Sequence, residues 1–107
     1  MNTIETLKQA LHTRIHAHPD TYYYVTLWEE MVAAFCSDLP AALHFIEFDC
    51  TDEELYYLGE VFDDIMEQTR SREFLDCLRR RVLSVADPEY KADILEDIRI
   101  AADYLDD

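Results

Sequence analysis

Carboxylates and tyrosines alternate with apolar residues along residues 51–69 at helical spacing. With Leu55, Leu58 and Phe62 facing a core, the opposite side of this helix carries phenol and carboxylate groups. Carboxylates attract cationic groups, and a tyrosine ring among them is a frequent anchor of protein interfaces. We therefore expect a contact set for a positively charged protein surface, consisting of Glu53, Tyr56, Tyr57, Glu60, Asp64 and Glu67.

The negative charge is concentrated in one part of the chain. Residues 15–69 contain thirteen acidic side chains and no Lys or Arg, in a chain of 107 residues with a net charge of −15. Like charges three or four residues apart destabilise an isolated helix by about 0.2–0.5 kcal/mol per pair. Because no basic residue within the segment offsets this cost, we interpret the pattern as a surface for a cationic partner. The alternative is a solvated acidic face with partly packed tyrosines.

The composition argues against several classes of function. A pI near 4.3 predicts repulsion from phosphate backbones and anionic lipids, so we expect no direct nucleic-acid or membrane binding. The single glycine, Gly59, cannot build a Gly-rich phosphate loop. No apolar run reaches the ~18 residues of a membrane span, and MNTIETLKQALHTR lacks the layout of a secretion signal. A cytoplasmic location is expected.

Histidine and cysteine residues offer weaker candidates for chemistry. Two imidazoles four residues apart on a helix, such as those of His12 and His16, can share a zinc ion. No Cys or carboxylate stands nearby at the spacing of a further ligand, and His18 is not expected to be one either. We expect surface histidines there, a partly buried His44, and neither metal nor cofactor. The cysteines form no C-x-x-C pair and no glycine near them suggests an oxyanion hole, so we expect reduced, mostly buried thiols and no enzymatic activity; they are Cys36, Cys50 and Cys77.

Arginines form the only basic patch. Successive helical residues diverge by 100°, so the side chains of the triplet at 79–81 fan apart. We expect them to pair with carboxylates of neighbouring helices or with Asp76, and a phosphate site is the alternative. The patch comprises Arg70, Arg72, Arg79, Arg80 and Arg81. Trp28 falls on an inward-facing stripe and is expected in the core.

An all-α fold must position these residues, because one glycine and three prolines supply few of the turns a sheet needs. Apolar periodicity predicts about six short helices in a single domain over residues 1–107, as a helical bundle or an irregular α-α array. Residues 22–25 also fit a short strand, although helix is favoured. The predicted starts are a capping box at Asn2 and Glu5, a second helix near Thr21 after Pro19 and Asp20, then Asp38 with Pro40, Thr51 with Glu54, Ser71, and Asp87 with Pro88.

The inward stripes of these helices follow three- and four-residue intervals. Each stripe covers one side of its helix, so the helices are expected to pack around a common core. The stripe residues are Ile4, Leu7, Leu11 and Ile15; Tyr24, Leu27, Trp28, Met31 and Phe35; Leu39, Leu43 and Ile46, with Phe45 and Phe48 widening the surface; Leu55, Leu58, Phe62 and Ile65; Phe74, Leu75, Leu78, Val82 and Val85; and Ile94, Ile98, Ala101 and Leu105.

Two segments, CTDEELYYLGEVFDDIMEQTRSREFLDCLRRR and ADILEDIRIAADYLDD, carry a family resemblance. An acidic and aromatic helix (50–69) is followed by a Ser-Arg-x-Phe junction (71–74), a helix ending in basic residues (77–81) and a closing D-I-x-x-A-x-x-Y helix (97–104). This order resembles the short helical immunity proteins of bacterial contact-dependent growth inhibition and related polymorphic toxin systems. The resemblance covers residues 50–107, and Asp87-Pro88 departs from the Tyr-Pro-like turn of that family.

The resemblance implies a non-enzymatic inhibitor in the cytoplasm. It would bind the C-terminal toxin domain of a secreted exoprotein, and many such toxins are nucleases with basic substrate grooves. The acidic contact set agrees with such a partner. A general helical adaptor or regulatory protein that binds a basic surface unrelated to toxins is the alternative hypothesis, and the toxin's substrate and the oligomeric state stay open.

Overall fold

Helices account for all regular structure in the part of the chain that the structure, a computed structural model, describes: residues 3–17 and 24–105. The predicted all-α class is therefore confirmed. The α-helices are α1 (Thr3–Ile15), α2 (Tyr24–Ser37), α3 (Leu39–His44), α4 (Asp52–Leu58), α5 (Phe62–Thr69), α6 (Arg72–Val82) and α7 (Pro88–Ala102). A π-helical turn η1 (Phe45–Asp49) and two 3₁₀ turns, η2 (Gly59–Val61) and η3 (Asp103–Leu105), complete the order.

Side-chain caps begin four of these helices where the sequence predicts them. Asp38 accepts from the backbone N–H of Ala41 ahead of α3, and Ser71 accepts from that of Phe74 ahead of α6. At α4 the capping box between Thr51 and Glu54 is complete in both directions. Asp87 accepts from two backbone N–H groups of α7, whose first residue is Pro88. These caps satisfy donors that the first helical turn leaves free.

The predicted single helix over 51–69 is wrong in one respect, because η2 separates α4 from α5. Val61 departs from helical geometry, with φ −120° and ψ 9°. Gly59 itself is helical at φ −54°, so its role is spatial: a Cβ there would lie 2.5 Å from Oδ2 of Asp97 on α7. The break thus coincides with a close approach of α7. The spacing of residues along the sequence cannot predict such an approach, because it depends on packing between distant segments.

The N-terminal predictions are described only in part. The capping box at Asn2 and the helix start near Thr21 lie outside the described residues, as do Pro19 and Asp20. Tyr24 and Val25, from the stretch that also fitted a strand, belong to helix α2.

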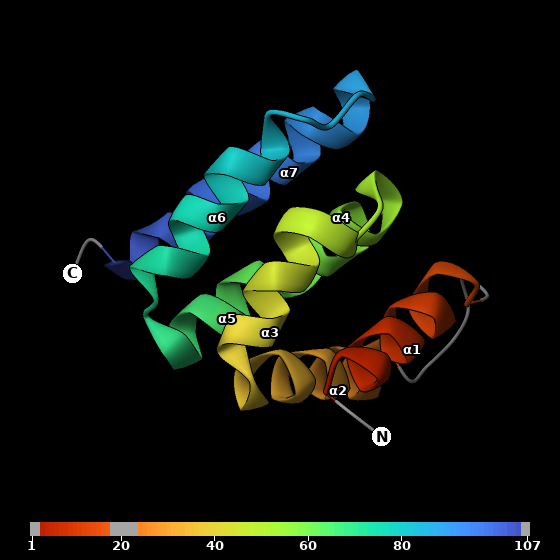
Figure 1. The fold of residues 1–107 in the computed structure, drawn as a ribbon. Coiled ribbons are helices and arrows are strands. Elements are labelled where there is room, and N and C mark those ends of the chain that lie inside the picture. The colour runs from red at the N-terminus through yellow and green to blue at the C-terminus, as the bar shows by residue number, and fades with distance from the viewer. Residues whose placement is uncertain (1–2, 18–23, 106–107) are drawn as a thin grey trace.

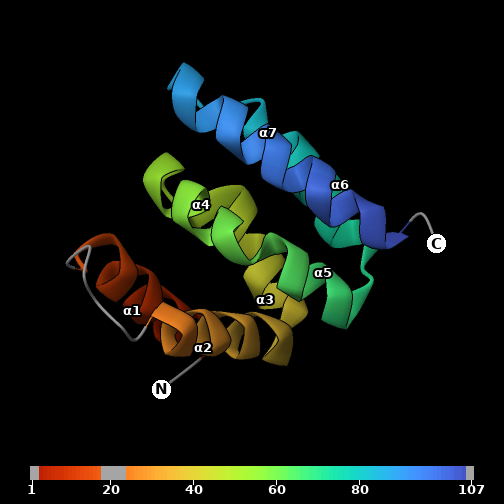
Figure 2. The same cartoon turned by 180° about the vertical axis from the view of Figure 1, so that it is seen from behind.

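The helices stack in three layers (Figure 1). The hairpin of α1 and α2 forms one outer layer, and the hairpin of α6 and α7 forms the other, with α3, α4 and α5 between them. Figure 2 shows the same order from behind, with α5 lying between α2 and α7. The middle layer therefore contacts both hairpins, which gives the acidic part of the chain neighbours on two sides.

One hydrophobic core joins the three layers, as the one-sided stripes predict. Phe35 of α2 and Phe62 of α5 both pack edge-on against Phe74 of α6, at ring-centroid distances of 5.1 and 5.9 Å. Phe48 lies outside this core and is 69% exposed. The predicted inward residues that are fully buried include Leu7, Leu11, Met31, Phe35, Ile46, Leu55, Leu58, Phe62, Ile65, Phe74, Leu78 and Ile94.

Within the described residues, no single helix has the length and apolar character needed to cross a bilayer. Helix α2 and the segment Leu39–Asp49 meet the length and composition criteria only as a pair, and they are bent by 106° relative to each other. Both segments contribute buried residues to the core.

Candidate functional site

Five of the six residues of the predicted contact set line two different grooves, three of them before Val61 and two after it. Tyr56, Tyr57 and Glu60 line a groove of about 400 Å³ between α1, α4 and α7, which we call the tyrosine groove. Asp64 and Glu67 line a second groove of about 730 Å³ between α2 and α5, the α2–α5 groove. Glu53 is exposed on α4 and lines neither. The structure thus does not unite these residues in one site.

Arg14 of α1 neutralises part of the tyrosine groove. Its guanidinium donates two hydrogen bonds to Glu60, of 2.8 Å from Nε and 2.7 Å from Nη2, and it lies 4.3 and 5.0 Å from the ring centroids of Tyr24 and Tyr57. The indole N–H of Trp28 donates to the same carboxylate at 3.3 Å. The expectation of uncompensated charge is therefore wrong at Glu60. Arg14 was missed because it stands just before the acidic segment and reaches Glu60 across 46 residues of sequence.

The two tyrosines of the contact set are half-buried, which corrects the expectation that they stand exposed. The ring of Tyr56 stacks on Tyr90 of α7 with centroids 4.4 Å apart, and it meets Tyr57 edge-on at 5.2 Å. The packing of these rings against neighbouring helices is the alternative that the sequence left open. Burial, followed by nearby negative charge such as Asp93, raises the pKa of Tyr56.

Acidic side chains gather on the α7 side of the tyrosine groove. Asp97 is half-buried beside Gly59, and burial together with Asp93, Asp63 and Glu60 raises its pKa to about 6. No ion pair is described for Asp97, whereas its neighbour Glu96 pairs with Arg99 at 2.6 Å. A carboxylate in this position has lost water without gaining a cation, which disfavours its ionised form.

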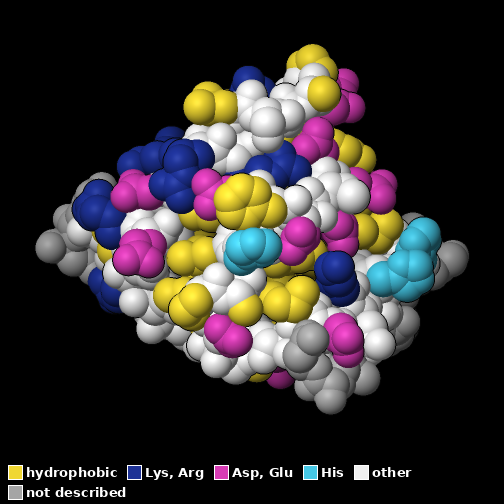
Figure 3. Space-filling view, in the orientation of Figure 1, with side chains coloured by type: hydrophobic (Ala, Val, Ile, Leu, Met, Phe, Trp, Pro, Cys, Tyr) yellow, Lys and Arg dark blue, Asp and Glu magenta, His cyan; other side chains and the backbone are white. Residues whose placement is uncertain are grey.

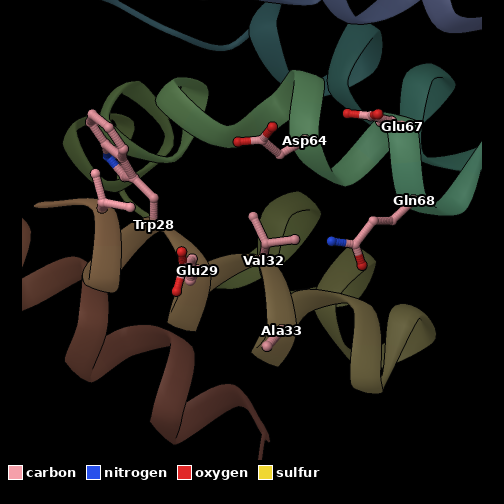
Figure 4. A pocket seen from close by; sticks show the side chains of 8 residues that line it. Trp28, Glu29, Val32, Ala33, Asp64, Glu67 and Gln68 are labelled. Atoms are coloured by element: carbon pink, nitrogen blue, oxygen red, sulfur yellow. The ribbon is translucent and has the colours of Figure 1, made fainter.

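The α2–α5 groove combines an apolar floor with acidic walls (Figure 4). Val32 lies at its centre between the two helices, with Trp28 toward one end and Gln68 toward the other. Glu29 stands on the α2 side, and Asp64 and Glu67 stand on the α5 side. In the described residues none of these three carboxylates forms an ion pair. Burial raises the pKa of Asp64, and the charges of Asp63 and Glu67 raise it further.

Trp28 contributes to this groove as well as to the core. The sequence predicts a core residue, and the side chain does pack against the core while it stays partly exposed. Its indole joins the two grooves, since it lines the α2–α5 groove and donates to Glu60 of the tyrosine groove.

The basic patch lies over α6, where Figure 3 shows Lys and Arg side chains with Asp and Glu between them. Arg81 donates to Asp52 at 2.9 Å and to the backbone carbonyl groups of Ile46 and Cys50. Arg80 pairs with Glu47 at 3.1 Å. The predicted pairing with carboxylates of neighbouring helices is confirmed for these two arginines.

The contact with Arg81 also favours the ionised form of Asp52. Burial acts to raise the pKa of Asp52, but hydrogen bonds from Arg81 and from the backbone N–H of Ala86 outweigh it and lower the pKa. Asp52 is therefore a satisfied carboxylate that ties α4 to α6, unlike the carboxylates of the α2–α5 groove.

The histidine and cysteine candidates are dispersed. The rings of His12 and His16 lie 4.4 Å apart, His18 is outside the described residues, and no group of three or more potential metal ligands occurs in the described part of the chain. His44 is exposed beside Asp49, which corrects the expectation of a partly buried residue. Cys50 and Cys77 are buried as predicted, and burial raises the pKa of Cys50 to about 11.

Comparison with family models, with curated proteins and with solved structures finds no match to this chain. A functional conclusion therefore depends on the charges and surfaces described above. The most distinctive of these is the α2–α5 groove, where exposed apolar area and uncompensated carboxylates occur together.

Proposed function

We propose that the chain is an immunity protein that binds and neutralises the C-terminal toxin domain of a contact-dependent growth inhibition exoprotein. The toxin is proposed to be a nuclease. Such an enzyme presents Lys and Arg where it holds phosphates, so it offers the cationic surface that an acidic inhibitor needs. The family resemblance of residues 50–107 names the system, and the electrostatics support it independently.

The single observation that carries the proposal is the set of carboxylates without cationic partners around the α2–α5 groove. Glu29, Asp64 and Glu67 form no ion pair among the described residues, whereas Arg14, Arg80 and Arg81 all pair with other acids. Carboxylates held close together without a counter-charge lower the free energy of unfolding, and they gain most from a cation that a partner supplies. A partner that supplies Lys or Arg there would recover this energy on binding.

We assign different roles to the members of the contact set. Glu53, Asp64 and Glu67 are exposed and are proposed to oppose basic toxin residues. Tyr56 is proposed to contribute its free edge as an anchor, next to Tyr90. Tyr57 and Glu60, with Arg14, are proposed to fix the shape of the tyrosine groove at the border of the interface.

Co-expression with the protein encoded by the adjacent gene tests the proposal. We expect the wild-type chain to restore growth to cells that make this toxin domain, and the double variant Asp64→Asn with Glu67→Gln to restore it less. The matched control is Asp76→Asn with Glu73→Gln on α6, which removes the same charge elsewhere. Full protection by the groove variant, with a wild-type circular dichroism spectrum, contradicts the proposed contact face.

The adaptor hypothesis has a different outcome in the same test. A general adaptor has no reason to be encoded beside a toxin gene, and it gives no protection in co-expression. Absence of toxin activity from the neighbouring product, combined with stable binding of this chain to an unrelated basic protein, would replace the immunity proposal with the adaptor hypothesis.

A further inference from the structure

We propose that the α2–α5 groove receives one amphipathic basic helix of the partner, with an apolar side chain on the groove floor and Lys or Arg side chains toward both walls. The nature of the partner rests on the proposed function. The inference goes further by assigning the groove, the secondary structure of the bound segment and its charge pattern.

The floor of the groove calls for an apolar side chain. Val25, Trp28, Val32 and Ala33 supply it from successive turns of α2, and Val25 is 58% exposed. Figure 4 shows the side chain of Val32 between α2 and α5, and at 5% exposure it forms the buried bottom of the groove. An apolar side chain seated on Val25, Trp28 and Ala33 would remove their exposed surface from water, which stabilises a complex by roughly 25 cal/mol per Å² buried.

The walls call for cations on either side of that side chain. Asp64 and Glu67 stand three residues apart on α5 and so share a face, and Glu29 stands opposite on α2. Burial and mutual repulsion raise the pKa of Asp64, which is the behaviour of a carboxylate that lacks a neighbouring cation. Charge complementarity therefore selects a basic occupant and disfavours nucleic acid or an acidic peptide.

The fold also favours a helical conformation of the bound segment. All regular elements in the described residues are helices, which satisfy their own backbone hydrogen bonds, so no sheet edge is offered to an extended peptide there. Recognition must then use side chains, and a helix in a groove presents apolar anchors at i, i+3, i+4 and i+7 with basic residues between them. Such a helix would lie between α2 and α5 and complete a three-helix contact.

The single tryptophan of the chain reports directly on this groove, because Trp28 lines it. The probe is a synthetic amphipathic peptide of Leu and Lys, with Leu at i, i+3, i+4 and i+7. We expect a saturable blue shift of Trp28 fluorescence that weakens as salt is added. A peptide with the same Leu positions and Glu in place of Lys should give no shift. Absence of a saturable shift with the Lys peptide overturns the inference.

Two glutamines give a matched pair of variants. Gln68→Arg places a cation at the end of the groove, four residues after Asp64, where an opposite-charge helical pair also supports folding. Gln9→Arg makes the same change on the exposed side of α1. We expect Gln68→Arg to weaken peptide binding about tenfold or more and Gln9→Arg to change it little. Equal affinity of the two variants overturns the inference.

The toxin protection assay separates this inference from the proposed function. If wild type and Gln9→Arg protect cells and Gln68→Arg protects less, both stand. Undiminished protection by Gln68→Arg overturns the groove assignment and leaves the immunity function in place. Groove-dependent peptide binding without toxin neutralisation by wild type does the reverse: it supports the groove as a site for a basic helix and overturns the immunity proposal.

Discussion

Among the described carboxylates, Asp97 is the one whose pKa its surroundings raise most. Its carboxylate lies against Gly59, and burial together with Asp93, Asp63 and Glu60 raises its pKa from 3.8 to about 6. A raised folded-state pKa means that the folded chain binds this proton more tightly than the unfolded chain. Ionisation of Asp97 therefore lowers the free energy of unfolding, and the loss accumulates as the pH rises through this interval.

Asp97→Asn is expected to stabilise the chain at neutral pH, because the amide has no charge to desolvate. The gain should be about 1 kcal/mol at pH 7.5, a value reduced for the half-exposed position, and smaller at pH 5. Urea denaturation at both pH values measures it. The control is Asp76→Asn on the exposed side of α6, where we expect little change. A gain for Asp97→Asn that does not grow with pH would show that the ionisation of Asp97 is not its cause.

Arg14 is the residue that holds the tyrosine groove together. Its side chain is only 16% exposed, and it bonds Glu60 through two nitrogens while lying beside the rings of Tyr24 and Tyr57. The pair Arg99–Glu96 has similar geometry, but both side chains are more than half exposed. The chain thus contains a shielded and a solvated version of the same interaction.

Arg14→Met should cost about 2 kcal/mol of unfolding free energy, because Glu60 is left without its cation and the two rings lose their partner. Arg99→Met should cost less than about 1 kcal/mol, as is usual for surface pairs. Chemical denaturation of both variants, with Glu60→Gln to complete a double-mutant cycle, gives the coupling energy. Equal costs for Arg14→Met and Arg99→Met would contradict the structural role assigned to Arg14.

At the level of elements, the sequence predicts starts better than continuity. Caps act within four residues, so Asp38, Thr51, Ser71 and Asp87 can be recognised from local spacing, and the structure confirms all four. The interruption at η2 coincides with the close approach of α7 to Gly59, which no local pattern contains. For the same reason the contact set could be named residue by residue, while its division between two grooves could not be foreseen.

The cap of α6 offers a test at this scale. Ser71→Ala removes the acceptor for the backbone N–H of Phe74, whose ring is buried against Phe35 and Phe62, and we expect a loss of about 1 kcal/mol. Ser37→Ala changes a serine in the last turn of α2 that caps no N-terminus, so its effect should be smaller. Thermal unfolding compares them. A larger effect at Ser37 would mean that capping does not anchor α6.

At the level of the whole molecule, composition predicts the fold class and the negative sign of the electrostatic field. It does not predict which carboxylates pair with arginines. The core residues follow from apolar periodicity because helices of this length must bury one side. The local electrostatic field depends on which carboxylates pair with an arginine, and packing between helices decides this. Arg14 of α1 pairs with Glu60 of η2, and Arg81 of α6 pairs with Asp52 of α4. The α2–α5 groove keeps its charge because no arginine reaches it in the described structure.

The location of charge, beyond its total, should therefore control association with a basic partner. Asp64→Lys with Glu67→Lys and Glu73→Lys with Asp76→Lys raise the net charge of −15 by the same amount, on α5 and α6 respectively. If the α2–α5 groove receives the partner, the α5 variant should bind the toxin domain about tenfold more slowly at low salt, and the α6 variant should lose much less. Stopped-flow fluorescence of Trp28 measures both rates, and added salt should reduce the difference as it screens the field. Equal slowing of the two variants would show that the partner responds to net charge alone, in which case the groove has no special part in recognition.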